Sequence, residues 1–256
     1  MNVTDTATII ARVRAAESEL PPEARLFIDP FARLFTGEPE VDEVVAQFGA
    51  VPFVREQVRV RTRFIDDFVR QGIADGLRQV IILGAGFDCR AIRLEEIATS
   101  GSRVYEVDFG EQLATKRAVL EAAGVAIPQL LRFVACDLAA DNFESSLSAG
   151  LAAEGFSTGG RTLFIWEGVI SYLNPTEIDR ALCWMANVSA PGSRVVFNYT
   201  INQLSGIDPE SMSARAKAAG FASIDDRSAG SLYHEYLKAE PPSEVADFFR
   251  LAVAIR

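Results

Sequence analysis

Two glycines and an aspartate, each following a short apolar run, are the residues whose types and spacing point most directly to chemistry. Gly84 and Gly86 follow the apolar run 79–83, and Asp108 ends a second apolar run that begins at Val104. Glycine lets the backbone approach a ligand closely, and a carboxylate at the tip of the next strand can accept hydrogen bonds from both ribose hydroxyl groups. The pattern therefore predicts a strand, glycine loop, helix and strand that bind an adenosine-type ligand.

Two features separate the candidate ligands. A dinucleotide-binding fold has a third glycine, which lets the helix pack tightly against the strand beneath a pyrophosphate. Cys89 occupies that position here, which disfavours an NAD(P)-dependent oxidoreductase and leaves it as a third alternative. About 80 residues precede the glycine loop. That arrangement is common where helices form a lid over the site, as in enzymes that use S-adenosylmethionine (SAM).

Polar residues also follow the other predicted strands. In open α/β sheets the ligand lies outside the carboxyl ends of the strands, so residues at these tips are candidates for the site. A carboxylate there can instead cap the following helix, as Asp137 could for a helix near 141–148. Polar groups at four or five successive tips exceed what an ordinary core requires. The further tips carry Asp137 with Leu138, Glu167 with Gly168, and Asn198 with Tyr199.

Strand-length and helix-length segments alternate after a helical first third. Helical periodicity over 8–20 and 56–71 predicts a helical cap or lid in residues 1–75, and residues 76–256 are expected to form the ligand-binding core of a single domain. The alternation is typical of an α/β fold with a mostly parallel sheet and helices on both faces, in which the last strand could run in reverse. The expected strands span 80–84, 103–108, 132–136, 162–167, 194–199, 222–226 and 247–255.

The composition indicates an acidic globular protein with a substantial core. The chain has 256 residues, of which 49% are hydrophobic and 23% charged, and a formal net charge of −10. Nucleic-acid binding depends on phosphate neutralisation by Lys and Arg, and a membrane-spanning helix needs about 20 apolar residues, so we expect neither partner. The N-terminus lacks the features of a secretory signal, which predicts a cytoplasmic protein. Three scattered cysteines, Cys89, Cys136 and Cys183, predict neither a disulfide framework nor a metal site.

Five segments, in order and with compatible spacing, carry a family resemblance. They are Asp29-Pro30-Phe31-Ala32, Arg61-Thr62-Arg63-Phe64-Ile65-Asp66-Asp67, Leu83-Gly84-Ala85-Gly86-Phe87-Asp88, Glu106-Val107-Asp108-Phe109 and Glu167-Gly168-Val169-Ile170-Ser171-Tyr172-Leu173. From about residue 8 to about residue 200 the chain resembles the leucine carboxyl methyltransferase-like family of SAM-dependent O-methyltransferases, including bacterial members that act on polyketide-like small molecules. The resemblance implies the class I (Rossmann-like) SAM-dependent methyltransferase fold with seven strands, SAM as cofactor and a small-molecule substrate.

The resemblance also implies roles near the amino-acid part of SAM. Arg61 matches the arginine that holds the SAM carboxylate in the family, and a guanidinium suits this task because its fork can pair two oxygens at once. Arg59 and Arg63 are spaced two residues away on either side, and Arg61 is the best alignment of the three. Gly84 and Gly86 match the loop beside the amino-acid part of the cofactor.

Further roles follow along the strand tips. By the same resemblance, Asp108 matches the ribose-binding acid, and Asp137 and Leu138 match the pair that flanks adenine. Glu167 matches the acid near the amino group of SAM, and Tyr172 lies where the family places an aromatic side chain at the substrate entrance. After residue 199 the chain is shorter than many members, which build part of the substrate pocket there. The resemblance is therefore not specific for a substrate.

The acceptor of the methyl group is the least determined part of the function. His234 is the only histidine and a candidate general base, although residues 232–236 also fit an ordinary amphipathic turn. A carboxylate is already ionised at neutral pH, whereas a phenol with a pKa of about 10 would benefit from a base. We therefore expect methyl-ester formation on a small organic acid. The alternatives are O-methylation of a polyketide-like phenol and a SAM-binding protein that transfers no methyl group. Oligomeric state stays open.

Overall fold

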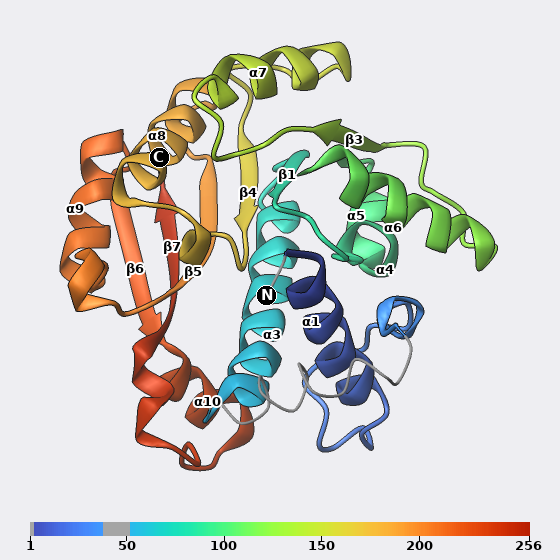
Figure 1. Ribbon diagram of the computed structural model, residues 1–256, viewed down its shortest axis with the longest axis vertical. Helices are drawn as coiled ribbons and strands as arrows, with labels where there is room; N and C mark the ends of the chain where they lie inside the picture. Colours follow the sequence, from blue (N-terminus) through green and yellow to red (C-terminus); the bar gives the residue numbers. More distant parts are fainter. Residues whose placement is uncertain (1–2, 38–51) are drawn as a thin grey trace.

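A seven-stranded sheet forms the centre of the computed structural model, which describes residues 3–37 and 52–256 (Figure 1). The strand order is β3-β2-β1-β4-β5-β7-β6. Neighbouring strands from β3 to β5 are parallel, and β7 pairs antiparallel with both β5 and β6. The predicted α/β fold with a mostly parallel sheet and a reversed last strand is thus confirmed. The strands are β1 Gln79–Leu83, β2 Arg103–Asp108, β3 Leu131–Ala135, β4 Thr162–Trp166, β5 Arg194–Thr200, β6 Ser223–Ser228 and β7 Phe249–Ile255.

The central strand β1 shows why these apolar runs form strands. Successive side chains of a strand point to opposite faces of the sheet. Val80 and Ile82 pack with one buried cluster, whereas Ile81 and Leu83 pack with another on the opposite face. Because both faces are covered by helices, a continuous apolar run replaces the alternation of a half-exposed strand.

Helices cover both faces of the sheet. Buried side chains of α3 and α5 pack on the face of Val80, and those of α7, α8 and α9 pack on the face of Ile81. Helix α8 starts at a capping box formed by Asn174 and Glu177, with Pro175 in its first turn, which is a favourable sequence for a helix start. The helices of the core are α3 Val54–Ala74, α4 Arg90–Arg93, α5 Glu95–Ser100, α6 Gly110–Ala122, α7 Phe143–Ala153, α8 Pro175–Val188, α9 Pro209–Ala219 and α10 Ala229–Leu237.

The N-terminal third is divided between a cover and the helix layer. Helix α1 Val3–Ser18 and the short helix η1 Ala32–Phe35 pack with Phe87, Cys89 and Leu120 near the glycine loop. Helix α3 instead packs along the sheet and also against α10, so the segment expected to form the cap contributes to the core as well (Figure 1). Residues 38–51 of the expected cap lie outside the described residues. The remaining short helices are η3 Ile170–Tyr172, η4 Gln203–Ser205 and η5 Glu244–Phe248.

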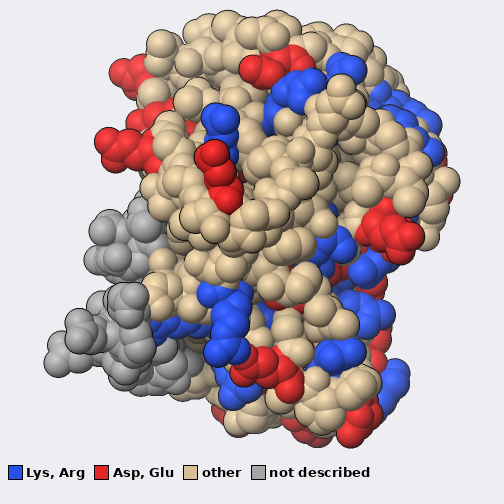
Figure 2. All heavy atoms as spheres, turned by 90° about the vertical axis from the view of Figure 1, so that its right-hand side faces the viewer, with Lys and Arg blue, Asp and Glu red and all other residues tan. Residues whose placement is uncertain are grey.

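The surface carries charges of both signs. On the face shown in Figure 2, acidic and basic side chains are interspersed among uncharged ones. Exposed ion pairs such as Arg33 with Glu19 are part of this pattern. Among the described helices, none combines the length and the apolar character that crossing a membrane requires.

Candidate active site

The glycine loop after β1 requires glycine for two separate reasons. Gly84 has a φ of +67°, and a Cβ atom added there would lie 2.3 Å from Cγ2 of Val169. Gly86 also has a positive φ, of +46°, and a Cβ atom added there would lie 3.5 Å from the Cβ of Ala7 on α1. Residues other than glycine rarely adopt this left-handed backbone conformation. The loop is therefore shaped by glycine and lies directly beneath α1.

Asp108 at the end of β2 fixes this loop and faces the same pocket. Its Oδ2 accepts a hydrogen bond of 2.7 Å from the backbone N–H of Gly86, and its Oδ1 accepts one of 2.7 Å from the N–H of Phe109. The residue is buried, and this burial raises the pKa of Asp108 above its ordinary value. Each carboxylate oxygen has two lone pairs, so both oxygens can still accept a hydrogen bond from a bound hydroxyl group.

A pocket opens at the carboxyl ends of β1, β2 and β4, with α1 along one side. This position is where open α/β sheets bind their ligands. Its lining falls into two groups of side chains. The charged wall consists of Arg14, Arg61, Asp88, Asp108 and Glu167. The apolar rim consists of Ile10, Phe109, Val169, Tyr172 and Leu173.

Arg61 is the arginine of α3 that reaches the pocket. Its Nε donates to Oε1 of Glu167 at 2.7 Å, across 106 positions of sequence. Arg59 and Arg63, the other two candidates, are paired elsewhere. Arg59 contacts Glu17 and the carbonyl oxygen of residue 24, and Arg63 contacts Asp67 and the carbonyl oxygen of residue 26. Of the three aligned arginines, only Arg61 lines the pocket.

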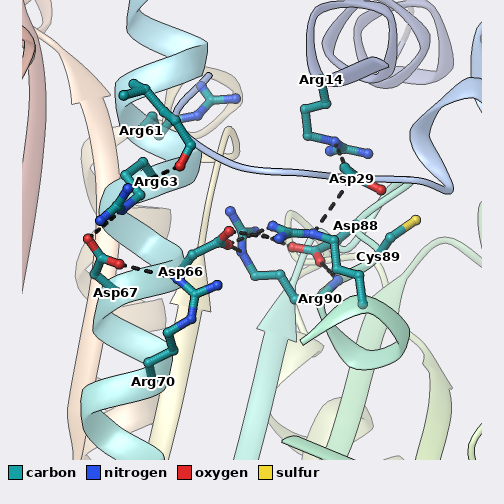
Figure 3. Close-up of polar contacts among 12 residues, drawn as sticks. Arg14, Asp29, Arg61, Arg63, Asp66, Asp67, Arg70, Asp88, Cys89 and Arg90 are labelled. Atoms are coloured by element: carbon teal, nitrogen blue, oxygen red, sulfur yellow. Dashed lines mark hydrogen bonds and ion pairs between the residues drawn. The ribbon is translucent and has the colours of Figure 1, made fainter. Parts of the chain in front are cut away.

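A network of buried ion pairs supports the charged wall (Figure 3). Arg90 on α4 contacts Asp66 of α3, Asp88 of the glycine loop and Glu167 after β4. Arg93 donates to both oxygens of Asp66, at 2.7 and 2.6 Å. The Arg90, Arg93 and Asp66 side chains are at most 3% exposed. Breaking such a pair by removing one partner leaves an uncompensated buried charge, so the network holds these three elements in one arrangement.

Helix α1 joins this network through Arg14. Its Nε lies 3.0 Å from Oδ2 of Asp29, and its Nη2 donates to the carbonyl oxygen of Phe87 at 2.5 Å. Asp29 in turn lies 3.7 Å from Nε of Arg93. The Asp29-Pro30-Phe31-Ala32 motif therefore has a structural role, because its carboxylate connects the covering helix to α4.

The arginines set the charge state of the acids. Burial alone would raise the pKa of Glu167, but Arg90 and Arg61 hold it below its ordinary value. Burial opposes ionisation of Asp88 in the same way, and Arg90 with Lys116 still lowers the pKa of Asp88 to about 2. For Arg61, burial lowers the pKa despite the proximity of Glu167. The neighbouring cations thus favour the ionised forms of Glu167 and Asp88 in the charged wall.

The apolar rim is more exposed and less constrained. Phe109 is 46% exposed and Tyr172 is 48% exposed. The Tyr172 hydroxyl donates a hydrogen bond of 2.9 Å to Oγ1 of Thr6, which connects η3 to the first turns of α1. An apolar, partly exposed surface of this kind can contact the body of an organic ligand without fixing its orientation strongly.

The structure brings most of the predicted site residues to one pocket. Those that line it are Arg61, Gly84, Gly86, Asp108, Leu138, Glu167 and Tyr172. Asp137 does not line it. Its side chain is exposed and accepts a hydrogen bond of 2.9 Å from the N–H of Ala139, and it caps no helix at 141–148, since α7 begins after Asn142.

His234 lies away from the pocket. It is on α10, its side chain is 62% exposed, and its Nδ1 lies 3.3 Å from a carboxylate oxygen of Glu240. Helix α10 packs against α3, β6 and β7, and contributes no residue to the pocket lining. The amphipathic-turn interpretation of residues 232–236 matches this placement.

Several pocket residues received no role from the sequence. Ala7, Ile10 and Arg14 lie three and four positions apart, so they share one face of α1, which is the face over the pocket. In the sequence, the feature that could have indicated this role is a charged residue, Arg14, on a helix face that is otherwise apolar. Asp88 belongs to a recognised motif, and its contacts with Arg90, two residues away, are local, whereas the contact of Arg90 with Glu167 depends on the fold.

Comparisons with known proteins show the family of this chain. The sequence profile of the leucine carboxyl methyltransferase family matches residues 7–186. A protein of Mycobacterium ulcerans named as a SAM-dependent methyltransferase is 35% identical over 241 residues, which cover 84% of this chain and 71% of the relative. The match extends beyond the profile and spans the motifs that form the pocket.

Solved structures show the same fold at low identity. A methyltransferase structure from Thermobifida fusca aligns with a TM-score of 0.63 and 15% identity over 96% of this chain and 94% of that one. Magnesium protoporphyrin IX methyltransferase from Synechocystis, solved with bound SAM, aligns with a TM-score of 0.50 and 18% identity over 97% of both chains. These two structures show the shared fold. The profile and the Mycobacterium relative show that this chain belongs to the leucine carboxyl methyltransferase family and is a SAM-dependent methyltransferase.

Proposed function

We propose that this methyltransferase transfers the methyl group of SAM to a carboxylate oxygen of a small organic acid and so forms a methyl ester. The supporting observation is that each carboxylate of the charged wall already has strong partners. Asp108 accepts two backbone N–H groups, and Arg90 contacts both Asp88 and Glu167. In this proposal none of them acts as a base towards the acceptor, because Asp108 is assigned to the glycine loop and the ribose and the other two are held by Arg90. A carboxylic acid is ionised at neutral pH and needs no such base, whereas a phenol does.

The charged wall fits the polar half of SAM. Asp108 has free lone pairs on both oxygens for the ribose hydroxyl groups. A guanidinium has five N–H donors, and the contacts of Arg61 with Glu167 and Gln57 use two of them. The remaining donors can pair with the carboxylate of SAM, and Glu167 offers negative charge to its amino group. Leu138 supplies an apolar contact for adenine.

In this proposal Asp137 acts on the adenine site indirectly, without contacting the ligand. Its exposed carboxylate accepts a hydrogen bond from the backbone N–H of Ala139 in the same loop. It thereby supports the turn that carries Leu138 into the pocket. His234 has no part in the proposal, because its distance from the pocket removes the reason for expecting it to act as a base.

Catalysis in this scheme depends on alignment. When bound, SAM supplies an electrophilic methyl carbon on its sulfonium. The chain contributes by holding the acceptor oxygen in line with that carbon and by excluding water. The apolar rim suits this task because Ile10, Val169 and Leu173 offer no competing polar group. Tyr172 at the mouth can contact the body of the acceptor and position it.

The test is a methyl-transfer assay with paired acceptors. Purified protein with SAM is given benzoic acid or phenol, and aliphatic acids or alcohols of equal length, and release of S-adenosylhomocysteine is measured from pH 6 to 9. We expect turnover on the acids with little change in rate over this range. Turnover on phenols alone, rising steeply above pH 8, would contradict the proposal. Calorimetric titration with SAM, S-adenosylhomocysteine and NADH accompanies the assay, and tight SAM binding without turnover on any acceptor would favour a non-transferring protein.

A further inference from the structure

Arg90 lies one layer behind the pocket and connects three carboxylates that come from three parts of the chain. Its Nε donates to Oδ1 of Asp66 at 2.8 Å, and its Nη1 donates to Oε2 of Glu167 at 2.7 Å and to Asp88. Arg90 is 2% exposed and is absent from the pocket lining. It therefore cannot touch a ligand in the pocket and can act only through the acids that it holds.

Both oxygens of Glu167 are held by arginines from different elements. Arg61 of α3 donates to Oε1, and Arg90 of α4 donates to Oε2, each at 2.7 Å. Two charge-assisted hydrogen bonds from opposite partners restrict rotation of the carboxylate. Arg61 lines the pocket and can contact a ligand as well as Glu167. Arg90 does not line the pocket, so its effect on a ligand is limited to orienting Glu167 and favouring its negative charge.

We propose that Arg90 is a positioning residue for cofactor recognition, which holds the Glu167 carboxylate in the orientation and charge state that attract the amino group of SAM. This inference rests on the proposed function in one respect, namely that Glu167 contacts the amino group. It extends that function by giving a residue outside the pocket control over the affinity for SAM.

The electrostatic part of this role follows from what faces Glu167. Arg61 on α3, Arg90 on α4 and Arg14 on α1 favour its ionised form, whereas Asp88 of the glycine loop and burial oppose it. Without Arg90, the attraction from the nearest cation on α4 is lost while burial and Asp88 remain. The pKa of Glu167 should then rise, and its negative charge should be lost as the pH falls.

Arg93 provides a matched control for a general loss of buried charge. It lies on the same short helix, its side chain is 3% exposed, and it contacts Asp66 and Asp29 in place of Glu167. Removing either arginine disturbs the shared partner Asp66. Only removal of Arg90 deprives Glu167 of a direct contact, so the two variants separate positioning from packing.

The experiment compares SAM binding by Arg90→Gln, Arg93→Gln and the parent protein, by calorimetry at pH 5.5 and 7.5. Circular dichroism of each variant establishes that it is folded. For the parent and for Arg93→Gln we expect the same ratio of dissociation constants between the two pH values. For Arg90→Gln we expect this ratio to be at least about fivefold larger, with weaker binding at pH 5.5. A ratio equal to that of the parent would overturn the proposal.

If Arg90→Gln does not fold, the lysine variants Arg90→Lys and Arg93→Lys, which keep the positive charge, test the role of Arg90. A lysine ammonium cannot reproduce the contacts of a guanidinium with three acids. Arg90→Lys should therefore weaken SAM binding at pH 7.5 at least about threefold more than Arg93→Lys does. Equal affinities of the two lysine variants would overturn the proposal.

Glu167→Gln separates failure of this inference from failure of the proposed function. It should weaken SAM binding at least about tenfold at pH 7.5, since it removes a charged hydrogen-bonding partner. If Glu167→Gln binds SAM like the parent, the assignment of Glu167 itself is wrong. If Glu167→Gln weakens binding but Arg90→Gln behaves like Arg93→Gln, only the role of Arg90 is wrong.

Discussion

The charged wall and the apolar rim line the same pocket, but they are built in opposite ways. Each acid of the charged wall accepts hydrogen bonds from at least two donors, and the side chains of the supporting arginines Arg90 and Arg93 are at most 3% exposed. The apolar rim is packed by partly exposed side chains and connected to α1 through the hydrogen bond between Tyr172 and Thr6. One half of the pocket is held by buried ion pairs and hydrogen bonds, and the other is formed by apolar side chains that are partly exposed.

This difference suits a cofactor that is always the same and an acceptor whose shape must be selected. Fixed charges recognise a ligand without reorganisation at the moment of binding. If the rim contacts the acceptor, as the proposed function has it, substitutions there are expected to change the acceptor without disturbing the cofactor. Substitutions in the two regions should therefore affect different measurements.

The largest effect is expected from Asp66→Asn on the stability of the fold. Asp66 is fully buried and pairs with both Arg90 and Arg93, so removing its charge leaves two buried cations short of a partner. We expect a loss of about 3–5 kcal/mol in the free energy of unfolding, measured by urea denaturation. Asp67→Asn, on the adjacent residue with a 39% exposed side chain, should cost no more than about 1 kcal/mol. Equal losses would show that the buried network does not stabilise the wall.

Asp108→Ala should weaken SAM binding by about 1–3 kcal/mol, since it removes a charged partner from the ribose and frees the loop of Gly86. Calorimetric titration with SAM measures this loss. Glu111→Ala, which removes an exposed carboxylate in the first turn of α6, is the control and should bind SAM like the parent. An Asp108→Ala protein with unchanged affinity would exclude the ribose assignment.

Arg61→Lys should lower the affinity for SAM by about fivefold to tenfold, because an ammonium cannot contact Glu167 and a ligand carboxylate with the geometry of a guanidinium fork. The same titration measures it. Arg63→Lys is the control, because Arg63 lies two residues further along α3, its side chain is 38% exposed, and it does not line the pocket. A loss of the same size in Arg63→Lys would mean that α3 responds to any arginine replacement.

The smallest effect is expected from Tyr172→Phe, and it should fall on the acceptor. The substitution keeps the aromatic ring in the rim and removes the hydrogen bond to Thr6, which contributes about 0.5–1.5 kcal/mol. We expect KM for the acceptor to rise by about twofold to fivefold while the dissociation constant of SAM changes by less than about twofold. A larger effect on SAM than on the acceptor would contradict the division of the pocket into two functional halves.

Much of the fold could be predicted from local patterns. Each of the seven strands lies within two residues of its expected bounds. For the central strands the reason is that apolar runs bounded by turns reflect burial on both faces of the sheet. The edge strand β6 is different, because its sequence is largely polar and its side chains are only partly buried. The glycine loop was equally accessible, since the positive φ at Gly84 and Gly86 is a local backbone requirement. The expected cap was only partly informative, because an amphipathic pattern shows that α3 has a buried face but not which partner covers it.

The candidate site residues show most clearly what the sequence could predict and what it could not. The residue types at Gly84, Asp108 and Glu167 were set by the sequence pattern and the family resemblance. Among Arg59, Arg61 and Arg63 the resemblance favoured Arg61 by alignment, and in the fold Arg61 is the one of the three that contacts Glu167, 106 positions away.

Sequence alone determined the sheet, the glycine loop after β1 and the family of the enzyme, because these depend on short-range periodicity and on residue types at fixed spacing. Tertiary structure decided which distant charges pair, that Arg14 lines the pocket, that Arg90 lies behind it and holds Glu167, and that His234 lies away from it. The physical reason is that an ion pair needs its two groups within a few ångströms, and for residues far apart in the chain only the packing of helices on the sheet sets that distance.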